Sequence, residues 1–186
     1  VDYGISIGFE SNDLIIALLI VQFVGFPSAI IFGRLGERWG VRPSIFLAIG
    51  VYIAVTIWGT MMREKYEFYV LAIVIGLVQG GIQALSRSYY SRLIPKNQAA
   101  EYYGFYNMLG KFAAIIGPAL MAVVGLTMRN VLMPESPTAE QLIEVGQDAS
   151  RWSIASIIVL FVIGGTLLFF VDEEKGRAEA DYLSKN

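Results

Sequence analysis

Long, largely uncharged runs of hydrophobic residues alternate with short polar segments along this chain. At a rise of about 1.5 Å per residue, 20 helical residues cover about 30 Å, the thickness of the hydrocarbon core of a bilayer. Runs of this length predict an all-α membrane protein with five transmembrane helices. The predicted spans cover about residues 14–33, 43–62, 68–90, 101–127 and 152–171.

The polar segments between the spans carry most of the charge, and their Lys and Arg residues predict the orientation. Cytoplasmic loops of membrane proteins are enriched in these two residue types. Placing segment 33–42 inside gives nine Lys and Arg residues on the cytoplasmic side and four on the outer side. We therefore expect 1–13 to hold the outer end of a preceding span and an external loop, and 172–186 to form a cytoplasmic tail.

The composition agrees with a membrane protein and excludes several kinds of chemistry. Hydrophobic residues make up 55% of the chain and charged residues 16%, against about a quarter in soluble domains. The mean hydropathy is +0.57. The chain has no Cys and no His, so it lacks the common nucleophile, general base and metal ligands, and we predict no enzyme, no metal and no cofactor. A net charge of −2 argues against a nucleic-acid partner.

The polar segment between the first two predicted spans carries a recognisable motif. Gly33, Glu37, Arg38, Gly40 and Arg42 fit the pattern G-x-x-x-[D/E]-R-x-G-x-[R/K]. This pattern resembles the loop signature of the major facilitator superfamily of transporters, and the resemblance implies a gating loop. Glycines allow close packing, and a carboxylate beside arginines forms charge-assisted bonds that change as helices move. The alternative is an ordinary basic loop with turn glycines.

The same resemblance implies how much of a transporter is present. A facilitator half has six spans, and the signature follows the second. The five predicted spans are therefore five transmembrane helices of a six-helix major facilitator half-bundle, the C-terminal one, lacking most of its first helix. Because the chain begins at Val1 rather than Met, we expect it to be part of a longer protein. Its expected partners are membrane lipid, a small-molecule solute, and the missing N-terminal half or a second subunit.

Two further segments narrow the resemblance to one branch. Residues 84–95, with 101–107 after them, resemble the vacuole-effluxer branch of the superfamily. Bacterial members of that branch are permeases, and its eukaryotic members export amino acids from vacuoles. The resemblance implies a bacterial cytoplasmic membrane protein that moves a small solute, with amino acids as one candidate class.

Polar residues inside two spans are the candidate substrate path. Gln79 and Gln83 lie one helical turn apart in the third span, and Tyr103, Asn107 and Lys111 follow the same spacing in the fourth. Gln79 and Lys111 both fall near the middle of the membrane, so we expect Gln79, Gln83, Asn107 and Lys111 to face one another. Intramembrane polar groups usually face a protein interior or a water-filled path.

Each of these residues also has a structural interpretation. Lys111 suits a carboxylate or phosphate on the solute, but it also suits an ion pair with an acid elsewhere or a stem that extends toward the interface. The amides equally suit hydrogen bonds between helices. Arg87, one turn beyond Gln83, is interpreted as a positive anchor on the cytoplasmic side or a gate contact.

Small residues and one polar loop complete the prediction. Gly76 and Gly80 form a G-x-x-x-G pair, and Gly117 with Pro118 marks the fourth span; we interpret all four as helix-packing positions. Residues 128–150 are predicted as an outer loop containing a short amphipathic helix at 138–145.

The leading function is therefore a secondary active or facilitative transporter of a small solute that works by alternating access. The alternative is a non-transporting membrane subunit that scaffolds a complex. No Asp or Glu lies at the depth of Lys111 or Gln79 in the predicted spans, so this chain offers no buried carboxylate as a proton carrier.

Overall fold

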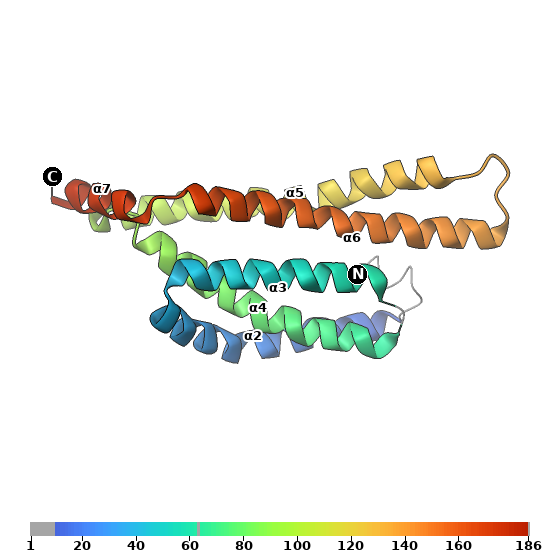
Figure 1. Ribbon diagram of the computed structural model, residues 1–186, viewed down its shortest axis with the longest axis horizontal. Helices are drawn as coiled ribbons and strands as arrows, with labels where there is room; N and C mark the ends of the chain where they lie inside the picture. The colour runs from blue at the N-terminus through green and yellow to red at the C-terminus, as the bar shows by residue number, and fades with distance from the viewer. Residues whose placement is uncertain (1–9, 63, 186) are drawn as a thin grey trace.

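A computed structural model describes residues 10–62 and 64–185 as a helical bundle (Figure 1). Five of its helices, α2 to α6, are long and apolar enough to cross a membrane, which confirms the predicted all-α class with five candidate spans. The helices are α2 (Ser11–Trp39), α3 (Val41–Met61), α4 (Lys65–Ser91), the 3-10 helix η1 (Lys96–Gln98), α5 (Ala99–Leu132), α6 (Ala139–Phe170) and α7 (Glu173–Lys185).

The helices form two groups joined along one seam. In the first group α2 and α4 pack along each other, with α3 against both; in the second, α5 and α6 form a long hairpin. The seam between the groups is the contact of α3 with α6. The turn at Gly40 and the turn after Met62 lie at opposite ends of α3, and we call these the Gly40 end and the Met62 end. Helices α2 and α4 both run from the Met62 end to the Gly40 end.

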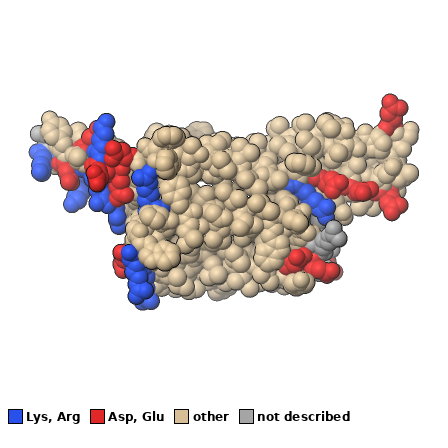
Figure 2. All heavy atoms as spheres, in the orientation of Figure 1, with Lys and Arg blue, Asp and Glu red and all other residues tan. Residues whose placement is uncertain are grey.

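Charge gathers at the two ends of the molecule and leaves the middle bare. In Figure 2, Lys and Arg side chains cluster at the Gly40 end with acidic residues of α7, and further acids mark the end of the α5–α6 hairpin. Charged side chains also lie along the hairpin, where Arg151 contacts Asp148, and at the Met62 end; the visible face between these and the Gly40 end is uncharged, as expected for helices in contact with lipid tails.

A single residue, Gly40, joins α2 to α3. Its φ of 92° lies in the left-handed region, which glycine adopts without the steric cost that a Cβ brings. The Ser44 hydroxyl donates to the Gly40 carbonyl oxygen at 2.8 Å and so holds the first turn of α3. The polar segment 33–42, predicted as a turn, is thus helical on both sides of one glycine.

The α5–α6 hairpin differs from the predicted outer loop of 128–150. Helix α5 continues to Leu132 and α6 begins at Ala139, so the predicted short helix at 138–145 is the start of α6. A capping box fixes this start, because the Thr138 hydroxyl accepts from the Gln141 backbone N–H and the Gln141 side chain accepts from that of Thr138. The hairpin therefore projects past α3 at the Met62 end (Figure 1).

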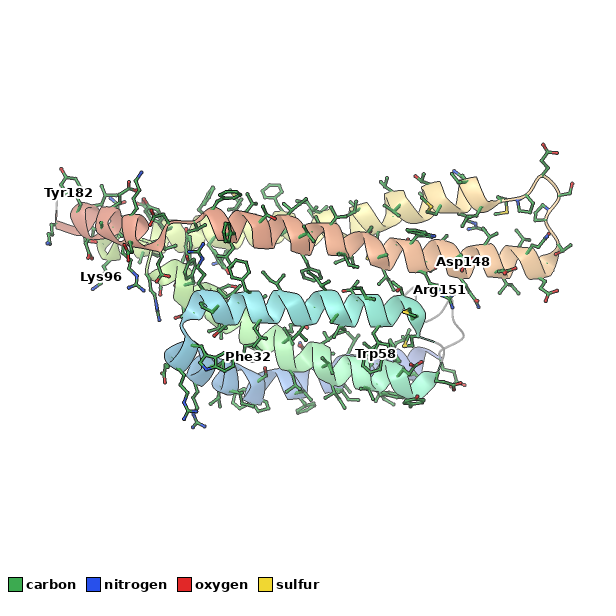
Figure 3. The ribbon with its side chains drawn as sticks, in the orientation of Figure 1. Phe32, Trp58, Lys96, Asp148, Arg151 and Tyr182 are labelled. Carbon is green, nitrogen blue, oxygen red and sulfur yellow. The ribbon has the colours of Figure 1, made fainter. Side chains whose placement is uncertain are left out.

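The tail after 172 forms α7, which lies against the connection between α4 and α5. The Lys96 backbone N–H donates to the Ser184 hydroxyl at 3.0 Å, and the Asn97 side chain donates to the Leu183 carbonyl at 3.3 Å. Figure 3 shows Lys96 and Tyr182 together at this end of the molecule. Since Ala180 is also buried, α7 is packed onto the bundle.

Candidate functional site

Helices α2 and α4 approach each other so closely that their backbones touch. A Cβ added at Gly76 would lie 2.8 Å from the Val21 carbonyl oxygen, and one added at Gly80 would overlap the Gly25 backbone. Phe32 of α2 lies directly on Gly81 of α4 (Figure 3). Small residues are what allow two helices this separation within a membrane.

Two side-chain hydrogen bonds, at different positions along the helices, fix how α2 and α4 are aligned. The fully buried Ser28 hydroxyl donates to the Leu77 carbonyl oxygen across the contact. Near the Met62 end the Tyr69 hydroxyl donates to an Asp13 carboxylate oxygen at 2.7 Å. Because both bonds join α2 to α4, the pair forms a rigid wall.

A hollow of about 400 Å³ opens on one side of this wall. Gln79 lies 14 residues, about 21 Å, from the start of α4, and Gln22 lies 11 residues, about 17 Å, from the start of α2. Both amides therefore lie in the middle third of their helices. The polar side chains that line the hollow are Gln22, Gln79, Gln83 and Arg87, and its floor includes Gly25 and Gly80.

Gln22 is the amide residue of this hollow that the sequence analysis did not propose for the path. It is the only amide in the first predicted span, and it lies within about 4 Å of the depth of Gln79, measured from the starts of α2 and α4. Comparing the depths of polar residues in all five predicted spans, and not only in the third and fourth, would have identified it.

A second hollow of about 440 Å³ lies between α2, α3, α4 and α6, and Val21 and Gln79 line both hollows. Its lining is almost entirely apolar, and the rings of Tyr52 and Phe161 stack there with centroids 5.1 Å apart. It offers few groups that orient a polar solute, whereas the first hollow offers several.

The predicted path residues of α5 lie away from the hollow. Asn107 and Lys111 are exposed and line none of it, and no described residue of α5 is buried. The structure thus does not bring Asn107 and Lys111 to face Gln79 and Gln83. The reason is that α5 packs against α6 and not along α4. Gly117, beside Pro118 within α5, also has no neighbour within 4 Å of an added Cβ.

Helices α4 and α5 meet at the Gly40 end through a tyrosine cluster. The Tyr90 ring lies 4.9 Å from the Tyr106 ring and 5.6 Å from the Tyr103 ring, measured between centroids. The Tyr103 hydroxyl donates to the Arg87 carbonyl oxygen at 3.2 Å. Tyr103 is therefore the α5 path candidate that contacts a residue of the hollow, Arg87, although Tyr103 is not itself among the lining residues.

The motif residues occupy the Gly40 end. Gly33, Glu37 and Arg38 are exposed on the last turns of α2. Arg42 donates to the Phe169 carbonyl oxygen at 2.5 Å, which satisfies one of the free carbonyls at the end of α6. Among the described residues, the carboxylate that pairs with arginines here is Glu173 of α7, which contacts Arg92 at 4.0 Å and also Arg177.

Comparison with known proteins identifies relatives along most of the chain. The family model described as "Vacuole effluxer Atg22 like" matches residues 5–134. The Uncharacterized MFS-type transporter YxiO of Bacillus subtilis is 40% identical over 92% of this chain and 36% of its own length. Autophagy-related protein 22-2 of Aspergillus niger is 30% identical over 96% of this chain, and Autophagy-related protein 22 of Yarrowia lipolytica is 25% identical over 80%.

The chain spans only about a quarter to a third of the length of these relatives, with 24% and 23% of the two fungal proteins covered. No solved structure matches it. The family match nevertheless covers well over half of the chain and agrees with the motif in segment 33–42. The chain therefore belongs to the Vacuole effluxer Atg22 like family, and one of its relatives is named as an MFS-type transporter.

Proposed function

We propose that the native protein is a secondary active or facilitative transporter that moves a small solute by alternating access. The observation that carries this proposal is the polar hollow at mid-depth between α2 and α4. Amides at that depth are costly in contact with lipid tails, and they are retained where they face protein or water. Transporter sites of this kind lie near the bilayer midplane between repeated bundles.

The remainder of the path is proposed to come from outside this chain. The hollow is open on one side, and α5 presents Asn107 and Lys111 on an exposed face. A second half, in the same polypeptide or in another subunit, would cover both. We propose that Gln79, Gln83 and Tyr103 then line the path together with Asn107 and Lys111.

The Gly40 end is proposed as the cytoplasmic gate. It holds the motif, and the charge bias of the sequence favours this side as the inner one. The bond of Arg42 to Phe169 ties α3 to α6, and the contact of Arg92 with Glu173 ties the end of α4 to α7; these are the interactions to be remade as the bundle rocks. The Bacillus relative supports a bacterial membrane as the location, and the Lys and Arg bias of the sequence supports a cytoplasmic C-terminus. Amino acids are the proposed solute class, as the resemblance to vacuole effluxers implies.

The test is transport by the purified native protein in liposomes preloaded with a mixture of radiolabelled amino acids. We expect efflux above that of protein-free liposomes, and a Gln79→Ala/Gln83→Ala double variant to lower it about tenfold. Gln98→Ala is the matched control, because Gln98 is an exposed amide outside the hollow.

The outcomes separate the two functions. Equal efflux by the wild type and the double variant would show that the hollow is not part of the transport path. No flux of any solute tested, with a stable protein that co-purifies with another membrane protein, would favour the scaffold function instead.

A further inference from the structure

Two further hollows meet end to end along the seam between α3 and α6, and neither belongs to the proposed solute path. The one at the Gly40 end, of about 620 Å³, is lined mainly by charged side chains, and the other, of about 370 Å³, is lined by apolar residues and one threonine. Phe169 and Phe170, at the end of α6, line both. The two hollows therefore form one continuous feature, which we call the seam groove, with a charged head and an apolar arm.

The apolar arm follows one face of α3. Phe46, Ile49 and Ile53 line it at spacings of three and four residues, so they share one side of the helix. Arg42, which lines the charged head, lies one turn before Phe46 on the same side. Ile53 lies 11 residues, about 17 Å, beyond Arg42. Since one leaflet supplies half of a hydrocarbon core of about 30 Å, the arm has the length of one leaflet.

The seam groove remains in contact with lipid when the rest of the transporter is in place. The proposed second half covers the hollow between α2 and α4 and the polar face of α5. The seam groove is lined by α3, α6, α7 and the residues that join α6 to α7. Figure 1 shows the seam along the length of α3. The part of each span that lines the arm carries no charge, so a lipid tail is the occupant that matches it.

The charged head offers groups of both signs at the end of the spans. The charged side chains that line it are Arg42, Asp172, Glu173, Glu174 and Arg177. Glu173 is already paired with Arg177. Within 10–62 and 64–185, no Lys or Arg forms an ion pair with Asp172 or Glu174. Arg42 gives one N–H to the carbonyl at the end of α6 and keeps further donors. A cation and two carboxylates are therefore available side by side.

We propose that the seam groove binds a zwitterionic phospholipid with a primary amine, of the phosphatidylethanolamine type, from the leaflet at the Gly40 end. The lipid phosphate lies against Arg42, because a guanidinium presents paired N–H donors to phosphate oxygens. The ammonium group donates to Asp172 and Glu174 through charge-assisted hydrogen bonds. One acyl chain lies along the apolar arm. This inference goes beyond the transport function and does not depend on it.

The headgroup, and not the tail, sets the selectivity of this site. Lipid tails are as apolar as the side chains of the arm, so exchanging one tail for another changes little. The quaternary ammonium of phosphatidylcholine has no N–H to donate to the carboxylates. Phosphatidylglycerol has no cation, so its phosphate brings a negative charge toward Asp172 and Glu174 with nothing to offset it.

The experiment counts bound lipids on the purified native protein by native mass spectrometry. The protein, stripped of lipid in detergent, is mixed with phosphatidylethanolamine, phosphatidylcholine and phosphatidylglycerol that carry the same two oleoyl chains. We expect one phosphatidylethanolamine to bind with a preference of about fivefold or more over each of the others. Glu174→Gln is expected to reduce its preference over phosphatidylcholine to within about twofold. Glu179→Gln, which removes an exposed acid of α7 outside the groove, should keep it.

A pair of neighbouring glycines tests the apolar arm. A Cβ added at Gly165 would lie 3.9 Å from the Ile49 side chain and 4.0 Å from that of Phe46, so a larger side chain there occupies the arm. Gly165→Leu is expected to weaken phosphatidylethanolamine binding about fivefold. Gly164→Leu is the matched control, because an added Cβ at Gly164 has no neighbour within 4 Å and Gly164 does not line the arm.

The outcomes test the headgroup and the tail separately. Equal binding of phosphatidylethanolamine and phosphatidylcholine by the wild type, or tighter binding of phosphatidylglycerol, would overturn the inference. A wild-type preference that persists in Glu174→Gln would overturn it as well. Glycerophosphoethanolamine, the same headgroup without tails, is expected not to compete; equal competition by it, or equal binding by the two glycine variants, would overturn the assignment to a membrane lipid. Because binding is counted without flux, failure of the transport proposal leaves each of these results interpretable.

Discussion

Two helices carry polar residues at the same spacing, and the structure treats them in opposite ways. On α4, Gln79, Gln83 and Arg87 line a hollow whose floor is a backbone contact with α2. On α5, Asn107 and Lys111 continue the line begun by Tyr103 but lie outside that hollow; exposure alone does not separate the two sets, because Gln83 and Arg87 are exposed as well. The difference lies in the neighbour: α4 has a partner helix that places glycines beside its polar face, and α5 has none there among the described residues.

This comparison separates what a polar pattern predicts from what it leaves open. A spacing of four residues shows which side chains share a helix face. It does not show which helix that face meets. The α4 face becomes a candidate site because α2 contributes Gln22 and Gly25 to it. The polar face of α5 has no such partner helix among the described residues.

The largest expected effect comes from breaking the wall behind the hollow. Gly80→Ala places a methyl group in the Gly25 backbone, so α2 and α4 must separate. We expect a loss of about 3 kcal/mol of stability, the upper part of the usual range for overpacking. Thermal unfolding of the native protein in detergent measures it. Gly50→Ala is the control, because an added Cβ at Gly50 has no neighbour within 4 Å; equal stability of the two variants would refute the close contact.

The next effect sharpens the contrast with α5. If Lys111 has no ion-pair partner in the native protein, Lys111→Met removes a cation from hydrocarbon depth and raises stability by about 2 kcal/mol, somewhat less than the full insertion cost. The same unfolding measurement tests this. A fall in stability of similar size would show instead that Lys111 is paired with an acid outside this chain.

A smaller effect concerns the motif at the Gly40 end. Arg42→Gln removes the charged donor to the Phe169 carbonyl and should cost about 1.5 kcal/mol, the low end for hydrogen bonds to charged groups. Arg38→Gln serves as its control because the Arg38 side chain is exposed. We expect the two variants to differ in unfolding temperature, and the same temperature for both would contradict the role given to Arg42.

The smallest effect lies at the far end of the hairpin. Thr138→Ala removes the capping hydroxyl of α6 and should cost about 0.5–1 kcal/mol. Amide hydrogen exchange in the first turn of α6 should become faster, and exchange in α4 should not change. Thr166→Ala is the comparison, since that hydroxyl bonds only within its own helix.

The sequence predicted the number of spans and the site of the tight turn because both depend on local features. Runs of 20 apolar residues fix the spans, and Gly40 fixes the turn. The start of α6 was missed because the polar residues of 139–151 hide the helical pattern, although the Thr138–Gln141 capping box was a readable signal. Gln22 and the separation of α4 from α5 depend on packing between helices, which spacing along one helix does not determine.

The central claim, that the α2–α4 hollow is a water-filled solute site, is tested most directly by the reactivity of introduced thiols. This chain has no cysteine, so in a native protein whose cysteines outside this chain are replaced, Gln83→Cys and Leu77→Cys each place a single thiol on α4, on different faces and about 9 Å apart along the helix. The native protein in membrane vesicles is treated with a charged, membrane-impermeant methanethiosulfonate reagent. We predict that Gln83→Cys reacts at least tenfold faster than Leu77→Cys and that an excess of a transported solute slows it. Equal, slow reaction at both positions would contradict the claim.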